Sequence, residues 1–263
     1  MKIIGFNHFQ LDSFDVEKTR KFYEALGGKT IRVLEREGGW RGYHVQLAEG
    51  AVIEIQPPRL PELCGGHDGW DHLALNVNSC AGACDLITAK GGHVEKVPTP
   101  NKLGTEPILN AVTYGPQGEK IEVIQLLSEK EKKSAEFLGV SHIQLNSSDP
   151  ARSREFYLKA FGGKVLFDIM SKDGSAVKGY MTELVPGSVI EIQPPRFEKT
   201  GKNSAWNTIA IETDDINTAC AQIEAAGGRK EVGPMKGTMG DTKILNAVII
   251  GPDEEHIELI QLV

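Results

Sequence analysis

The chain repeats itself, and this repetition constrains its fold more than any other feature of the sequence. Three motifs of the first half recur 134 to 137 residues later: Phe22-Tyr23 as Phe156-Tyr157, Gln-Pro-Pro-Arg of 56–59 at 193–196, and Leu-Asn-Ala-Val of 109–112 at 245–248. A nearly constant offset is typical of a duplication. The sequence therefore predicts two similar domains, residues 1–128 and 138–263. The charged segment 129–137 between them is interpreted as a linker or a solvated helix.

Each half contains the same smaller unit twice. Four stretches of helical periodicity begin near a polar residue suited to cap a helix and end at a Gly-Gly pair, which are start and stop signals of helices. The caps are Asp15, Ser79, Asp149 and Asp214, and the pairs stand at 27–28, 91–92, 162–163 and 227–228. A short alternating segment precedes each helix, and segments rich in β-branched residues follow it. We therefore predict an α+β fold of four βαβββ units.

Histidines and glutamates recur at matched positions of these strands. The first strands carry His8, His72, His142 and Thr208, and the last strands carry Glu54, Glu122, Glu191 and Glu258. A carboxylate within a Val/Ile strand costs several kcal/mol to bury unless a partner or a metal compensates. Because strand side chains alternate, Glu54 faces away from Ile53 and Ile55. The apolar face is then free to pack under the helices, and the His/Glu face lines a concave sheet, which favours metal binding.

This pattern resembles the vicinal oxygen chelate superfamily, which includes glyoxalase I, methylmalonyl-CoA epimerase, extradiol dioxygenases and fosfomycin- or bleomycin-resistance proteins. The resemblance covers the chain outside the linker. It implies that the units pair into two cupped mixed sheets, each holding a metal between ligands from two units. Pairing the first unit with the second implies one full site, like that of glyoxalase I, formed by His8, Glu54, His72 and Glu122.

The pairing of the units is open at this point. The second half offers a depleted or exchanged site of His142, Glu191 and Glu258, with Thr208 in place of the fourth ligand. Pairing the second unit with the third instead implies a full set of His72, Glu122, His142 and Glu191. His72 and Glu122 belong to the full site in both cases. His256, on the same strand face as Glu258, is a candidate substitute in the depleted site.

The glyoxalase-like ligand set implies a metal-dependent lyase or isomerase. We expect one divalent ion per chain, Zn, Ni, Co or Mn rather than Fe, which would polarise a carbonyl of a small oxygenated substrate and stabilise an enediolate. Glu122 or Glu54 would act as the base that removes the neighbouring proton.

Two other functions remain open from the sequence. An Fe(II)-dependent extradiol dioxygenase would need two histidines and one carboxylate, which His8, His72 and Glu122 would supply, but Glu54 would crowd the open side. A non-catalytic ligand-binding protein of the bleomycin-resistance type would leave the carboxylates in mid-strand unexplained.

Candidate substrate-binding residues are few. Trp40 and Arg41 precede a strand and are suited to form a rim with a cation for an anionic group. Arg59 and Arg196 follow Pro-Pro at the ends of two Glu-bearing strands, where each is suited to clamp a carboxylate or phosphate bidentately.

Composition narrows the remaining functional classes. The formal net charge of −7 makes nucleic acid a poor partner, since phosphate binding needs a cationic face. The apolar runs are far below the about 18 residues that span a bilayer. With no visible leader or disulfide framework, we expect a cytoplasmic protein. No glycine-rich phosphate loop indicates a nucleotide cofactor. Because four units supply the pairing within one chain, we expect a monomer or a homodimer.

Overall fold

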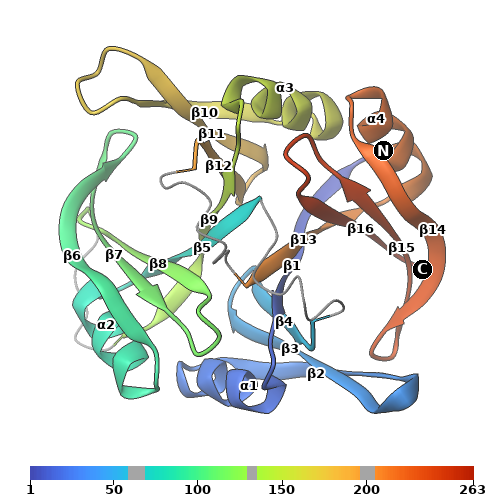
Figure 1. Cartoon of the computed structure of the whole chain (residues 1–263), viewed down its shortest axis with the longest axis horizontal. Helices are drawn as coiled ribbons and strands as arrows, with labels where there is room; N and C mark the ends of the chain where they lie inside the picture. The colour runs from blue at the N-terminus through green and yellow to red at the C-terminus, as the bar shows by residue number, and fades with distance from the viewer. Residues whose placement is uncertain (59–68, 129–134, 196–204) are drawn as a thin grey trace.

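The computed structural model describes residues 1–58, 69–128, 135–195 and 205–263. These residues form four successive βαβββ units, as the repeats predict (Figure 1). The first unit consists of β1 (Ile3–Asp12), α1 (Val16–Ala25), β2 (Lys29–Arg36), a 3-10 turn (Glu37–Gly39), β3 (Trp40–Ala48) and β4 (Ala51–Gln56). The second consists of β5 (Trp70–Val77), α2 (Cys80–Ala89), β6 (His93–Leu103), β7 (Glu106–Tyr114) and β8 (Lys120–Leu126).

The second half repeats this order. The third unit consists of β9 (Phe137–Asn146), α3 (Pro150–Phe161), β10 (Lys164–Met170), β11 (Val177–Val185) and β12 (Ser188–Gln193). The fourth consists of β13 (Trp206–Thr213), α4 (Ile216–Ala225), β14 (Arg229–Met239), β15 (Thr242–Ile250) and β16 (His256–Leu262). Most of the predicted linker, residues 129–134, lies outside the described residues. The domain limits stay a prediction. Among the described residues, no helix has the length and apolar character needed to cross a membrane.

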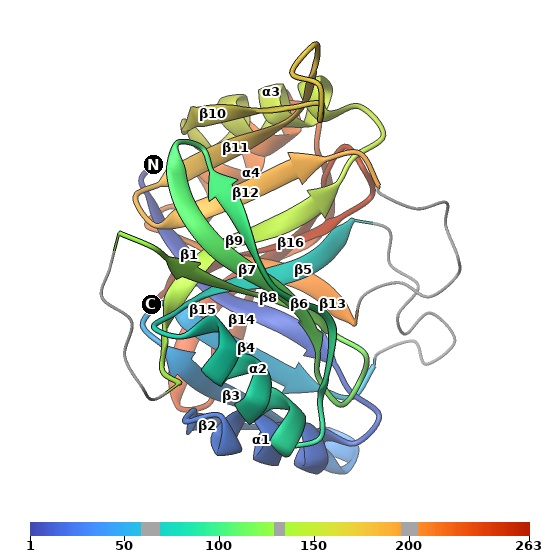
Figure 2. The same cartoon turned by 90° about the vertical axis from the view of Figure 1, so that its left-hand side faces the viewer.

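Each of the two sheets combines one unit from each half of the chain. Sheet A has the order β14-β15-β16-β13-β1-β4-β3-β2, and sheet B has the order β10-β11-β12-β9-β5-β8-β7-β6. The first strands of the units meet antiparallel at the centre, β1 with β13 and β5 with β9 (Figure 2). The fold of two curled mixed sheets is as predicted. Of the two pairings left open by the sequence, the structure has the second unit paired with the third. The first unit shares its sheet with the fourth.

The predicted caps explain where the helices begin, with one correction. Asp15, Ser79 and Asp149 each accept a hydrogen bond from a backbone N–H of the first turn of their helix. For α4 the cap is Asp215, which accepts from the backbone N–H of Thr218, and not the predicted Asp214. Asp214 instead accepts from the backbone N–H of Lys2 at 2.6 Å, so this carboxylate ties the N-terminus to the start of α4.

The Gly-Gly pairs meet two separate steric demands. At the end of α3, Gly162 adopts a φ of 77°, in the left-handed region that favours glycine. A Cβ on the next residue, Gly163, would lie 2.0 Å from the backbone oxygen of Glu183. The first glycine therefore ends the helix, and the second permits the following strand to pass close to β11.

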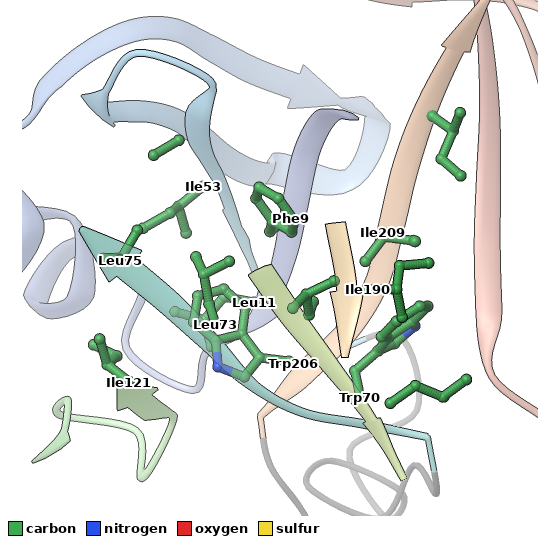
Figure 3. Close-up of a cluster of buried hydrophobic side chains, with 14 of the residues drawn as sticks. Phe9, Leu11, Ile53, Trp70, Leu73, Leu75, Ile121, Ile190, Trp206 and Ile209 are labelled. Atoms are coloured by element: carbon green, nitrogen blue, oxygen red, sulfur yellow. The ribbon is translucent and has the colours of Figure 1, made fainter. Parts of the chain in front are cut away.

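The apolar strand faces of both sheets meet in one core. Figure 3 shows this cluster, in which Phe9 and Leu11 of β1 lie near Leu73 and Leu75 of β5, although the two strands belong to different sheets. Two buried tryptophans form hydrogen bonds between the sheets. The Trp70 indole N–H donates to the backbone oxygen of His256, and the Trp206 indole N–H donates to the backbone oxygen of Lys120. Because the apolar faces are used here, the polar faces of the strands are left for the cups.

The repeated Phe-Tyr motif also joins the sheets. The Tyr23 hydroxyl of α1 donates to the buried Glu119 carboxylate at 3.0 Å, and Tyr157 of α3 donates to Glu255 at 2.7 Å. Each pair links a helix to the turn before the last strand of the next unit. Burial raises the pKa of both carboxyls to about 7 and outweighs the hydrogen bonds that favour their ionisation.

We predict that Glu119→Gln removes part of the pH dependence of stability. The folded chain binds the Glu119 proton more tightly than the unfolded chain, so the wild type loses stability as pH rises from about 4.5 to about 7. Glutamine keeps an oxygen for the backbone N–H of Gln117 and an amide N–H for the Tyr23 hydroxyl. The variant should therefore gain stability relative to the wild type across this window, by about 3 kcal/mol at most.

Denaturant unfolding at pH 5 and pH 8 measures this difference. Glu106→Gln, at an exposed position of β7, is the control and should leave the wild-type dependence intact. Parallel pH profiles for the wild type and Glu119→Gln would contradict the assignment.

Candidate metal centre

Four candidate ligands meet on the concave face of sheet B. They come from the two central strands and their parallel neighbours: His72 from β5, Glu122 from β8, His142 from β9 and Glu191 from β12. We call this set the β5–β9 site. All four lie on the polar faces of strands whose other faces are buried in the core, which is why a glutamate is found within a Val/Ile strand.

The strand register explains how ligands 119 residues apart come together. Gln144 of β9 pairs with both His72 and Glu191, and Ala74 of β5 pairs with both Glu122 and His142. Paired residues on neighbouring strands project to the same side of a sheet. The four ligands thus form two short rows on one face, related by the antiparallel pairing of β5 with β9.

The ligand atoms converge on one point. Nε2 of His72 lies 3.4 Å from Glu122 Oε2 and 3.9 Å from Glu191 Oε2. Nε2 of His142 lies 3.4 Å and 3.2 Å from the same two oxygens. Both Nε2 atoms are buried, and neither makes a hydrogen bond. Each Nε2 atom therefore faces two carboxylate oxygens at once and is hydrogen-bonded to neither.

Neighbouring polar groups orient each ligand. The Asp71 carboxylate lies 2.7 Å from Nδ1 of His72 and also accepts from the Lys120 ammonium at 2.7 Å. An Nδ1–H proton directed to Asp71 leaves the Nε2 lone pair of His72 facing the site. On the carboxylates, Oε1 of Glu122 accepts from the Asn110 amide at 2.6 Å, and Oε1 of Glu191 accepts from the Gln193 amide. The Oε2 atoms remain directed at the histidines.

The charges of the site are strongly coupled. Burial disfavours protonated histidine, but the Glu191 and Glu122 carboxylates outweigh it and raise the pKa of His142 to about 9. Burial likewise disfavours protonated His72, but the hydrogen bond to Asp71 and the Glu122 carboxylate outweigh it and raise its pKa. Burial opposes ionisation of Glu122, yet the two histidines hold its pKa well below the ordinary value. The two carboxylates therefore favour positive charge between them, which either protons on the histidines or a divalent cation bound by neutral histidines would supply.

These residues fit a divalent metal. Two imidazole nitrogens and two carboxylate oxygens suit Zn, Ni, Co or Mn, and the two unpartnered Nε2 atoms are the lone pairs that such an ion uses. His72, His142 and Glu191 have ligand atoms within 4.8 Å of one another, and Glu122 lies against both histidines. The ordered outer groups supply the orientation that metal ligands require.

The structure separates the ligand set that within-half pairing implied. His8 and Glu54 lie in sheet A, because β1 pairs with β13 of the fourth unit and not with the second unit, and β4 pairs with β1. The expected group of His8, Glu54, His72 and Glu122 is therefore wrong as a single site. His72 and Glu122 instead meet His142 and Glu191, the exchanged set. That these side chains bind metal stays a prediction.

Sheet A carries a second cluster, which contains one residue that the sequence analysis missed. His8 lies with Glu54 and Glu258 as the repeats imply, and Thr208 takes the fourth position. His44 of β3 pairs directly with Glu54, and its Nε2 lies 2.8 Å from Glu54 Oε2. The sequence contained one indication of this role, since His44 stands in the strand before the Glu54 strand and faces Glu54 if the two strands form a hairpin. Nε2 of His256, the substitute considered from the sequence, lies 4.0 Å from Glu231.

The predicted substrate-binding residues divide between sheet A and segments outside the described residues. Arg41 lines a cavity of about 720 Å³ together with His8, Glu54 and Glu258, and it pairs with Glu35 at 2.7 Å. Trp40 packs on a small apolar cluster that includes Leu34 and Met239. Both therefore lie near the sheet A cluster and not in sheet B. Arg59 and Arg196 lie outside the described residues.

Comparison with known families agrees with the duplication of the chain. Residues 5–123 and 139–259 both match the family described as the Glyoxalase/Bleomycin resistance protein/Dioxygenase superfamily. The chain belongs to this superfamily. The two matches cover nearly all of both halves, so the duplication is a duplication of the family domain.

Relatives with assigned names give the comparison more detail. The chain is 29% identical over 239 residues to "Probable lactoylglutathione lyase, chloroplastic" of Arabidopsis thaliana, covering 85% of this chain and 64% of that protein. It is 32% identical over 124 residues to lactoylglutathione lyase of Salmonella typhimurium, covering 45% of this chain and 90% of that protein. The superfamily member glyoxalase I from Zea mays has the same fold, with a TM-score of 0.73 at 22% identity, covering 98% of this chain and 92% of that chain.

We predict that Asp71→Asn weakens metal binding at the β5–β9 site by about 10- to 100-fold, because His72 loses the charged acceptor that orients it. Titration of the chelator-treated protein with Zn²⁺ measures the affinity. Ser141→Ala is the matched control, since Ser141 contacts Nδ1 of His142 at 3.1 Å without a charge. Its effect should be smaller. Equal affinity in the wild type and Asp71→Asn would argue against His72 as a ligand.

Proposed function

We propose that the chain is a divalent-metal-dependent lyase or isomerase of the glyoxalase I type, acting at the β5–β9 site. The observation that carries this proposal is the convergence of His72, His142, Glu122 and Glu191 on one buried point. When bound there, the ion would polarise a substrate carbonyl and stabilise negative charge on the adjacent oxygens. We expect Zn, Ni, Co or Mn, since the neutral-histidine and carboxylate set suits all four.

The names of the relatives point to the substrate class. A lactoyl thioester and the hemithioacetal of the same thiol with methylglyoxal, a 2-oxoaldehyde, contain the same atoms. Their interconversion takes a proton from the carbon bonded to sulfur, returns a proton to the neighbouring carbon, and transfers the hydroxyl proton from the oxygen of the first carbon to that of the second. Because the relatives are named for lactoylglutathione, we propose the hemithioacetal of glutathione with a 2-oxoaldehyde as the substrate.

Glu122 is assigned as the base that moves this proton. Its Oε2 lies 3.4 Å from each histidine, whereas Glu191 engages His142 at 3.2 Å, and the Glu122 side chain is slightly more exposed, 14% against 11%. Asn110 holds the other oxygen of Glu122 in place. The carboxylate is thus anchored at one oxygen and available at the other, which suits a group that must meet a substrate carbon.

The other two functions have less support from the geometry. The dioxygenase triad of His8, His72 and Glu122 is not assembled, because His8 lies in sheet A. A triad drawn from sheet B would leave a second carboxylate against the open side of the iron. A non-catalytic binding protein would have no use for two histidines and two glutamates that converge on one point and are oriented by neighbouring polar groups. Glu54, proposed from the sequence as an alternative base, belongs to the sheet A cluster.

We predict that Glu122→Gln lowers kcat for thioester formation from methylglyoxal and glutathione by about 10²- to 10⁴-fold, because glutamine cannot accept the proton. The assay follows thioester absorbance at saturating Zn²⁺ or Ni²⁺, with metal content measured in parallel. Glu191→Gln makes the same charge change at the paired position and should reduce kcat less. Full activity in Glu122→Gln would remove Glu122 from the mechanism, and oxygen uptake with a catechol would replace the proposed function by the dioxygenase.

A further inference from the structure

We infer that the chain binds a second divalent cation in sheet A, with His44 supplying a ligand that the repeats do not provide. The ligands of this β1–β13 site are His8 from β1, His44 from β3, Glu54 from β4 and Glu258 from β16. The inference concerns a different sheet from the proposed active site and does not depend on that activity.

The register of sheet A shows what changed relative to sheet B. In sheet A, Gln10 pairs with both Thr208 and Glu54, and Glu54 pairs in turn with His44. In sheet B, Gln144 pairs with both His72 and Glu191, and Glu191 pairs with Met181. The histidine at the Thr208 end of the row is therefore missing, and a histidine has appeared at the other end. The count of two histidines and two glutamates is the same in both sheets.

The ligand atoms of His8, His44 and Glu54 lie close together in the β1–β13 site, and Glu258 contacts His8. Nε2 of His8 lies 3.1 Å from Glu54 Oε2 and 3.4 Å from Glu258 Oε2, and Nε2 of His44 lies 2.8 Å from Glu54 Oε2. The ligand atoms of His8, His44 and Glu54 lie within 4.8 Å of one another. His8 is 1% exposed, and its Nε2 has no hydrogen-bond partner although it faces both carboxylates.

Neighbouring polar groups orient His8 and Glu258, whereas Nδ1 of His44 is buried without a hydrogen-bond partner. Nδ1 of His8 lies 3.0 Å from the Asn7 amide oxygen, and the Asn7 amide nitrogen donates to Glu212 at 2.8 Å, which fixes the orientation of Asn7. A proton on Nδ1 of His8 then leaves the Nε2 lone pair for a cation. Oε1 of Glu258 accepts from the Asn246 amide at 3.0 Å, as Oε1 of Glu122 does from Asn110 in sheet B.

The site is also accessible. His8, Glu54 and Glu258 line the cavity of about 720 Å³ in the cup of sheet A. Arg41 and Lys236 line the same cavity. A hydrated ion therefore has a route to the three ligands, although the lining carries both cationic and acidic side chains, the latter including Glu35, Glu231 and Asp241.

The test is metal stoichiometry measured by elemental analysis of chelator-treated protein reloaded with Co²⁺, together with the cobalt visible spectrum. The wild type is expected to bind a second ion per chain beyond that of the β5–β9 site. His44→Met, which copies Met181 of sheet B, should lose only this second ion, and His72→Ala should lose only the first. Retention of the β5–β9 ion in His44→Met shows that this variant is folded.

Two further variants separate a ligand from a residue that only positions Glu54. His44→Gln keeps an N–H for the Glu54 carboxylate but offers no imidazole, and it should lose the second ion. Adding Thr208→His to His44→Met returns the histidine to the register position of sheet B, and it should restore the second ion. Retention of both ions in His44→Met or His44→Gln would overturn the inference. A wild type with a single ion that His72→Ala removes would also overturn it, without affecting the proposed function.

Discussion

The antiparallel pairing of β5 with β9 and of β1 with β13 decides which ligands meet, and the rest of the structure depends on it. The first strand of each unit pairs on one side with the last strand of its own unit. Its other edge would otherwise leave a row of backbone N–H and C=O groups unpaired. The equivalent edge of another unit satisfies them, and this choice of partner brings His72 to Glu191 and His8 to Glu258.

The polar groups in the cups are stable only as connected sets. Each carboxylate of the β5–β9 site contacts two histidines and one amide, so neither charge is left isolated. Convergence of the remaining lone pairs is the geometry that the proposed divalent metal requires. The core faces of the same strands contribute the stability that allows such an arrangement, since the apolar cluster runs through both sheets and all four helices.

The sequence predicts the four units and the strand face that carries the candidate ligands, but it does not predict which units pair. The helix caps, the Gly-Gly ends and the alternation around Glu54 are local features, so the residues themselves predict the units and the face that carries the ligands. The partner of each unit is a long-range choice between edges that look alike in sequence, and both pairings yield one full site. His44 escaped notice because it occupies a position where the other units have Val112, Met181 and Val248. Comparing the four units reveals residues that recur at the same position in each unit. His44 recurs in no other unit, so this comparison does not reveal it.

The difference between the two sheets follows from the same strand alternation that builds them. Residues such as Thr208 and His44 point into the cup, while Ile209 and Val45 on the same strands are fully buried in the core. Replacing a cup residue therefore changes the ligand set without altering the packing between the sheets. Within one cup, more than one strand position is suited to a ligand. The strands on both sides of Glu54 direct side chains to the same face as Glu54. A duplicated fold of this kind is thus able to keep the regular ligand set in sheet B while the set in sheet A is rebuilt around His44, since neither change requires the core or the central strand pairing to adjust.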